Sequence, residues 1–131
     1  QKIKNIFIYN GNVNELIDAL ECKEIFYSIW ILFPDPWPKK KHFKRRLFDK
    51  NFLLNLKKFI KKKGTIHIST DSKSYLIQIL SIIFELKKYY LWINQNKRSW
   101  EFDTDILPET KFLKKALKNK RKPIYIELQK L

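Results

Sequence analysis

The residues best suited to chemistry lie in one stretch, where an aspartate between two prolines precedes a dense run of cations. Asp35 stands between Pro34 and Pro36, and six of the eight residues at 39–46 are lysine or arginine. A residue that precedes proline is confined to extended backbone, so Asp35 belongs to a rigid loop. Lysine and arginine hold nucleic acid by its phosphates without reading its sequence. The pattern predicts a fixed carboxylate that faces a base while the cations bind the backbone.

Two plainer explanations stay open for the same residues. The proline-rich loop can be a stiff strand exit with a solvated Asp35, and the cations can form a solvated surface. The adjacent Arg45 and Arg46 favour phosphate binding, because guanidinium groups form forked contacts with phosphate.

Composition bounds the class of protein. The 131 residues suffice for one domain, and the net charge of +15, from 28 lysines and arginines against 13 acids, favours a polyanionic partner such as nucleic acid. An AT-rich coding sequence also enriches lysine, isoleucine and asparagine, so the arrangement of the cations is better evidence than their number. A general polyanion or membrane-surface binder is the least favoured reading, since it leaves the acids at strand ends unexplained.

Several site classes are not expected. The single Cys22 forms no internal disulfide and fits a reducing, cytoplasmic location, and neither His42 nor His67 has partners at metal-ligand spacing. The apolar runs are too short or too interrupted to span a membrane. The chain opens at Gln1 directly into a strand-like segment, as expected of a fragment or a processed product.

The elements that must position these residues alternate between strand and helix. We expect strands at residues 5–9, 25–33 and 65–70, and helices at residues 12–20, 49–61 and 74–86. Gly64 is expected to end the second helix, and the run at 25–33 is expected to be a central strand covered on both faces. Such alternation predicts an α/β fold with a parallel sheet, in which ligands bind at the carboxyl ends of the strands. Asp35 and Asp71 follow two of these ends, although Asp71 taken alone is better explained as the cap of the third helix.

The last third of the chain departs from this alternation. We expect strands at residues 89–93 and 124–128, a short basic helix at residues 110–119 between them, and a polar loop at residues 94–108. An antiparallel hairpin at the edge of the sheet fits this order.

Three motifs together resemble a known family. They are the proline-flanked Asp35 with its basic run, Ser69-Thr70-Asp71 after the next strand, and Thr110-Lys111-Phe112 near the end. In this order and spacing they resemble the bacterial tRNA (guanine-N7)-methyltransferases. The resemblance implies a Rossmann-like class I methyltransferase that moves a methyl group from S-adenosylmethionine to N7 of a variable-loop guanosine in tRNA.

The resemblance covers nearly all of this chain but only the later portion of the family's domain. It implies one partial domain over residues 1–131, mostly parallel, that lacks the first two strands and the cofactor-binding half. Such a truncated chain is expected to be inactive alone. The alternative is a non-catalytic, basic RNA-binding remnant of the enzyme.

The resemblance also implies roles for individual residues. Asp35 is the expected catalytic acid, and it also falls with Asn12 among the expected cofactor contacts. The expected substrate contacts are Lys39, Asp71, Thr110 and Lys111. The expected RNA contacts are Lys41, His42, Lys44, Arg45 and Arg46. Leu113 departs from the family, which has glutamate there, and an apolar side chain cannot accept hydrogen bonds from guanine.

The implied missing strands have a physical consequence. In the family's strand order they lie between the strand at 5–9 and the strand at 25–33, so the latter loses its neighbour. An apolar strand with an unpaired edge invites new pairing. We expect that either the 5–9 strand docks beside the 25–33 strand or two chains associate through that edge.

Overall fold

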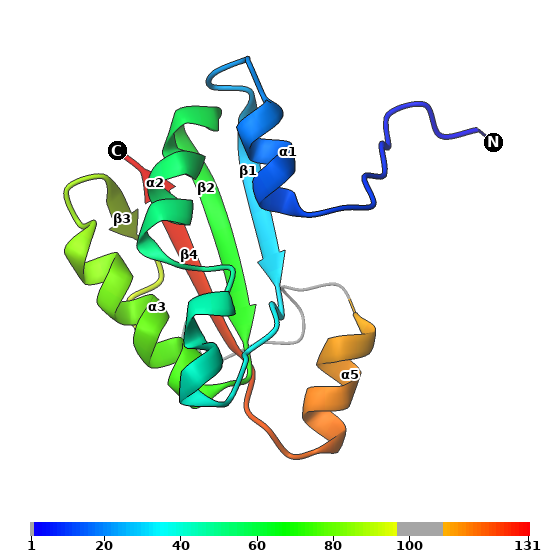
Figure 1. Cartoon of the computed structure of the whole chain (residues 1–131), viewed down its shortest axis with the longest axis vertical. Coiled ribbons are helices and arrows are strands. Elements are labelled where there is room, and N and C mark those ends of the chain that lie inside the picture. The colour runs from blue at the N-terminus through cyan, green and yellow to red at the C-terminus, as the bar shows by residue number, and fades with distance from the viewer. Residues whose placement is uncertain (1, 97–108) are drawn as a thin grey trace.

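The computed structural model describes residues 2–96 and 109–131, which form an α/β arrangement around a mixed sheet (Figure 1). Four strands of the described residues lie in the order β1-β2-β4-β3, with the bounds β1 Phe26–Leu32, β2 Ile60–Thr70, β3 Tyr90–Trp92 and β4 Ile124–Lys130. The β1–β2 pair is parallel, whereas β2–β4 and β3–β4 are antiparallel. The prediction of a mostly parallel sheet is therefore wrong, and the predicted antiparallel edge is confirmed.

The α-helices begin at polar caps, whereas the 3-10 helix has no side-chain cap. Their bounds are α1 Val13–Ala19, the 3-10 helix η1 Lys40–Arg45, α2 Lys50–Phe59, α3 Lys73–Glu85 and α5 Lys111–Lys118. Side chains of Asn12, Asp49, Ser72 and Thr110 accept backbone N–H groups at the first turns of α1, α2, α3 and α5. Within residues 2–96 and 109–131, no helix has the length and apolar character needed to cross a bilayer.

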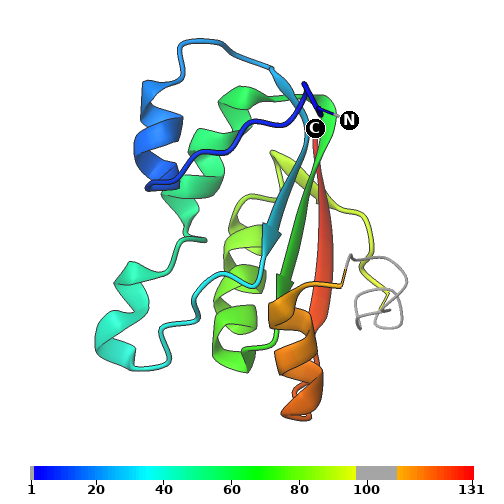
Figure 2. The same ribbon diagram turned by 90° about the vertical axis from the view of Figure 1, so that its right-hand side faces the viewer.

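The core lies between the sheet and the pair α2 and α3, which share one side of it in Figure 2. The predicted apolar stripe of α2 is confirmed, because Phe52, Leu53, Leu56 and Phe59 are all buried. From α3 the core takes Tyr75, Ile79, Ile82 and Ile83, and from β2 it takes Ile66 and Ile68. This packing holds the carboxyl ends of β1 and β2 in place.

The predicted strand at residues 5–9 does not form. This segment has no regular structure and runs away from the sheet (Figure 1), with Phe7 91% and Ile8 92% exposed. A strand needs a neighbour for its backbone hydrogen bonds, and this segment has none in the described residues. The prediction that it docks beside β1 is therefore wrong, while association of two chains stays a prediction.

β1 is an edge strand and not a covered central one. Tyr27 and Trp30 are 74% and 45% exposed, and only Ile31 of the strand is buried. Among residues 2–96 and 109–131, β2 is the sole neighbour of β1 in the sheet, so the other edge of β1 is unpaired there, as predicted.

Gly64 lies inside β2 and does not end a helix, so that prediction is wrong. α2 stops at Phe59, and β2 starts at the next residue. A Cβ atom at position 64 would lie 2.6 Å from Cγ2 of Ile60 and 3.0 Å from the carbonyl oxygen of Tyr27. The register between β1 and β2 shifts at this point, so glycine permits the close approach of the two strands.

The predicted elements near the C-terminus are confirmed as β3, α5 and β4. Asn94 ties two of them together: its Nδ2 donates to the carbonyl of Tyr125 (2.9 Å) and its Oδ1 accepts from the N–H of Glu127 (2.8 Å). The predicted loop at 94–108 is described only as far as residue 96, and the remainder lies outside the described residues.

His67 is buried on the face of the sheet away from α2 and α3, where it serves packing. Its ring stacks on Trp30 with centroids 3.9 Å apart, Nδ1 lies 2.6 Å from the Tyr125 hydroxyl, and Nε2 lies 2.9 Å from the Thr65 hydroxyl. Burial lowers the pKa of His67 from its ordinary 6.5, and nearby Glu127 opposes this only in part. The described parts of the chain contain no group of three metal-ligating side chains.

The lowered pKa of His67 predicts acid-sensitive stability. The unfolded chain binds a proton at pH values where the folded state still holds His67 neutral, so the free energy of unfolding falls as pH drops below about 6.5. His67→Phe keeps the ring stack and should flatten this slope between pH 7 and pH 5 in chemical unfolding experiments. His42→Phe is the control for losing an imidazole, and an unchanged slope in His67→Phe would contradict the assignment.

Candidate functional site

A cavity of about 550 Å³ opens at the carboxyl ends of β1 and β2. We call it the strand-end cavity. Asp35, in the loop after β1, and Asp71, after β2, both line it, as the strand order predicted. Its other lining residues are Phe33, Pro34, Pro36, Ser72, Phe112, Lys115 and Arg121. α5 lies beyond the ends of the two strands in Figure 1 and contributes Phe112 and Lys115.

The loop that carries Asp35 is sharply bent and internally bonded. Phe33 and Trp37 have positive φ values of 50° and 40°, a region that side-chain-bearing residues occupy only at some cost. The N–H of Phe33 donates to the carbonyl of Ser69 (3.0 Å), and the N–H of Trp37 donates to Oδ1 of Asp35 (3.1 Å). The exposed carboxylate is thereby oriented by its own loop, with Oδ2 accepting no hydrogen bond from the described residues.

Arg46 anchors this loop from inside the protein. It is 3% exposed, its Nε donates to the carbonyl of Pro36 (2.7 Å), and its terminal nitrogens donate to Ser74 Oγ (2.8 Å) and Gln78 Oε1 (2.9 Å). The guanidinium also lies over the Phe43 ring at 3.7 Å. Burial lowers the pKa of Arg46, although an arginine remains charged at any physiological pH. Arg46, expected to contact RNA, is buried and fixes the Asp35 loop to the first turns of α3, and its contact with RNA stays a prediction.

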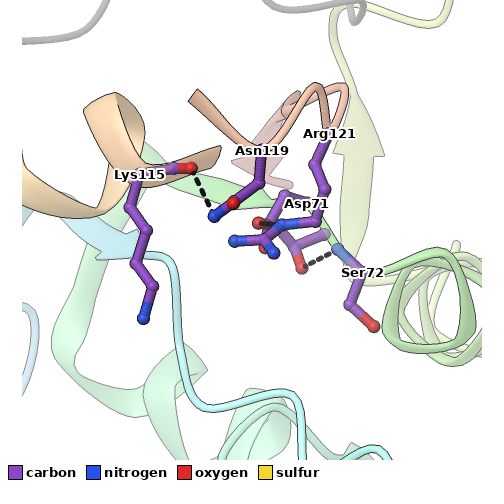
Figure 3. Close-up of polar contacts among 6 residues, drawn as sticks. Asp71, Ser72, Lys115, Asn119 and Arg121 are labelled. Carbon is purple, nitrogen blue, oxygen red and sulfur yellow. Dashed lines mark hydrogen bonds and ion pairs between the residues drawn. The ribbon is translucent and has the colours of Figure 1, made fainter. Parts of the chain in front are cut away.

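Asp71 does not cap α3. Ser72 does so, accepting the N–H of Tyr75 (3.3 Å). Asp71 is instead paired with Arg121, whose Nε donates to Oδ2 at 2.5 Å (Figure 3). The Asp71 side chain is 19% exposed, so the pair lies at the wall of the cavity and not deep within it.

Three predicted substrate contacts do not line the strand-end cavity. Thr110 caps α5 by accepting the N–H of Leu113 (3.1 Å), and Lys39 and Lys111 are exposed outside the cavity. Leu113, where the resemblance led us to expect glutamate, is 2% exposed and packs into the interior. The helix face that reaches the cavity carries Phe112 and Lys115, three residues apart.

The remaining predicted RNA contacts lie together on η1, with His42 half-buried. Lys41, Lys44 and Arg45 are exposed, and Arg45 lies over the Trp37 ring at 5.0 Å. His42 approaches the same ring edge-on at 5.6 Å. We call Lys41, His42, Lys44 and Arg45 the η1 cation surface. It adjoins the Asp35 loop directly in sequence.

The two expected cofactor contacts lie on different cavities. Asn12 caps α1, accepting the N–H of Asn14 (2.8 Å), and lines a second, polar cavity of about 410 Å³ with Lys44 and Arg45. Of these two cavities, Asp35 lines the strand-end cavity and not the second one. The two expected cofactor contacts therefore do not meet in one cavity of the described residues.

The strand-end cavity offers recognition chemistry. Two carboxylates accept hydrogen bonds from N–H donors, Phe112 supplies a flat apolar surface, and Lys115 and Arg121 supply positive charge. The Ser72 hydroxyl already accepts a helix N–H. A heterocycle that carries N–H donors and an attached anion is the ligand that this combination suits.

The known proteins that this chain resembles are methyltransferases. A family model described as "Putative methyltransferase" matches residues 1–126. A tRNA (guanine-N(7)-)-methyltransferase of Wolbachia pipientis wMel is 38% identical over 122 residues, which is 93% of this chain and 51% of that protein. A protein with the same name from Buchnera aphidicola subsp. Schizaphis graminum is 37% identical over 101 residues, 77% of this chain and 41% of that protein.

Coverage of these relatives is partial. The tRNA (guanine-N(7)-)-methyltransferase of Neorickettsia sennetsu is 36% identical over 85 residues, which is 65% of this chain and 39% of that protein. The chain thus spans about half, or less, of the length of these curated relatives.

Proposed function

The chain belongs to this methyltransferase family, and from that premise we propose that it forms the substrate-recognition and catalytic-acid part of a tRNA (guanine-N7)-methyltransferase. S-adenosylmethionine is the methyl donor proposed on the basis of the family. Its two expected contacts, Asn12 and Asp35, lie on different cavities of the described residues, so the roles below are assigned to residues of this chain alone.

The observation that carries the proposal is the shared cavity of Asp35 and Asp71. Guanine presents N–H donors at N1 and N2, which a carboxylate accepts well. N7 already has a lone pair, so methylation needs placement more than a strong base. Methylation at N7 leaves positive charge on the purine, and a fixed carboxylate nearby stabilises that charge. We assign the charge-stabilising role to Asp35 and the N–H-accepting role to Asp71.

The η1 cation surface supports a nucleic acid as the substrate. Its lysines are exposed, and it continues directly from the loop that holds Asp35. Phosphates bound there would bring a nearby base to the cavity, with affinity that depends on salt.

This surface gives a testable prediction for tRNA affinity. Lys41→Gln and Lys44→Gln together should weaken binding of an unmodified tRNA transcript and lower the slope of log affinity against log salt by about one per lost phosphate contact. Fluorescence anisotropy at stepped salt concentrations measures both. Lys62→Gln, an exposed lysine on β2, is the matched control. A slope that falls equally in Lys62→Gln would contradict a dedicated surface.

A chimera tests the function itself. This chain replaces the matched segment of the Wolbachia protein, and labelled methyl transfer to an unmodified tRNA transcript is followed by analysis of its nucleosides. We expect 7-methylguanosine. A chimera that binds tRNA but forms none, beside an active unaltered Wolbachia protein, would favour an RNA-binding remnant.

A further inference from the structure

Two cations, Lys115 and Arg121, supply the positive charge of the strand-end cavity, and the roles proposed above for Asp35 and Asp71 make no use of them. We propose that they bind the phosphate of the nucleotide whose base lies between Asp35 and Asp71. The inference rests on the proposed function, which supplies the nucleotide. Figure 3 shows Lys115 extending from α5 and Arg121, in the segment that follows α5, meeting Asp71.

The backbone at Arg121 is fixed by the way α5 ends. Lys120 has a φ of 55°, its N–H donates to the carbonyl of Leu117 (3.0 Å), and the N–H of Arg121 donates to the carbonyl of Ala116 (2.9 Å). These two bonds form a Schellman motif, in which the residue in the left-handed region is usually glycine. Arg121 therefore leaves the helix in a defined direction, toward Asp71.

The Arg121 guanidinium has donors to spare. Its Nε is engaged by Asp71, which holds the planar group in place, and its two terminal nitrogens make no hydrogen bond within the described residues. The side chain is 46% exposed, so an anion can reach it. A guanidinium held at one edge and open at the other suits a phosphate.

Lys115 differs from its neighbour on the same helix. The Lys114 ammonium is neutralised by Glu109 at 2.9 Å and lies outside the cavity. Lys115 lines the cavity, and among the described residues its ammonium makes no ion pair. The Asn119 side chain donates to the Lys115 carbonyl (2.9 Å), and this bond stabilises the last turn of α5.

The negative charge of Asp35 and Asp71 gives the two cations a function in phosphate binding. A nucleotide phosphate brought near Asp35 and Asp71 would be repelled by both carboxylates. Lys115 and the open edge of Arg121, which lies beside Asp71, offset that repulsion, so base and phosphate are accepted together.

The test measures affinity of the chain for guanosine 5′-monophosphate, guanosine and adenosine 5′-monophosphate by NMR titration. We expect the monophosphate to bind about tenfold more tightly than guanosine, as one charge-assisted contact provides. Lys115→Gln should remove most of that preference, whereas Lys114→Gln, with the same charge change on the same helix, should keep it. Arg121→Gln is a second variant and should also lose the preference. Circular dichroism confirms that each variant is folded.

The outcomes separate this inference from the proposed function. Equal affinity for guanosine and its monophosphate in the unaltered chain overturns the inference, and so does an equal loss in Lys115→Gln and Lys114→Gln. Failure of the proposed function has another signature, in which guanosine and adenosine monophosphates bind equally while the phosphate preference persists.

Discussion

Asp35→Asn in the Wolbachia chimera is expected to lower methyl transfer to tRNA about a hundredfold, with tRNA affinity almost unchanged. Asparagine is nearly isosteric, so the side chain can still accept the Trp37 N–H that orients Asp35 now. What disappears is the negative charge that faces the purine as it becomes positive. Single-turnover methyl transfer with labelled donor measures the rate, and anisotropy measures the affinity.

The matched control for this loss is Asp18→Asn. Asp18 is an exposed carboxylate on α1 that lines the second cavity and not the strand-end cavity. The Asp18→Asn chimera should retain the full rate of methyl transfer. If Asp35→Asn loses affinity and rate together, Asp35 contributes to binding in the ground state and not specifically to the charged product.

Arg46→Ala is expected to lower the free energy of unfolding by about 3 kcal/mol. The change leaves the partly buried Pro36 carbonyl and Gln78 side chain without the donor they now share, a guanidinium on a side chain that is itself only 3% exposed. It also removes the stack on Phe43. Urea unfolding followed by Trp fluorescence measures the loss, and the Asp35 loop should lose its fixed position before the core melts.

Two variants make this result specific to the buried contacts. Lys40→Ala removes an exposed cation from the same run and should change stability by less than about 0.5 kcal/mol. Arg46→Lys keeps the charge but lacks the fork that reaches Pro36 and Ser74 together, so it should recover only part of the loss. Equal effects of Arg46→Ala and Lys40→Ala would contradict the anchoring role.

Sequence reasoning succeeded where local signals decide the outcome. The polar caps and apolar stripes located α1, α2 and α5 closely, and the prolines around Asp35 marked a rigid loop. The placement of Asp35 and Asp71 at one end of the sheet followed from the parallel pairing of β1 and β2 alone.

Prediction from the sequence failed where the structure depends on pairing between segments that are distant in the chain. Residues 5–9 have a strand-like pattern but no neighbour, and β4 turned the sheet mixed by pairing antiparallel with β2. Gly64 is a strong helix terminator in isolation, yet here it permits close strand contact. Neither the partner of a strand nor what a glycine meets in space is legible from one sequence.

The run of cations at residues 39–46 also shows that burial of a single side chain cannot be predicted from the sequence alone. Arg45 and Arg46 are adjacent and chemically identical, but one is exposed over Trp37 and the other is buried beneath the loop. Lys115 and Arg121 lie in a stretch that reads as surface cations, and only the end of α5 turns Arg121 toward Asp71. The i, i+3 spacing of Phe112 and Lys115 was the available signal for this face.

The most direct test of the central claim is an NMR titration of the ¹⁵N-labelled chain with guanosine 5′-monophosphate. If one guanine lies between the two strand-end carboxylates, the amide signals of Asp35 and Asp71 should shift along a single binding curve, and adenosine 5′-monophosphate should shift them far less. Movement of only one of these signals, or equal shifts with both nucleotides, would contradict a guanine site at this end of the sheet.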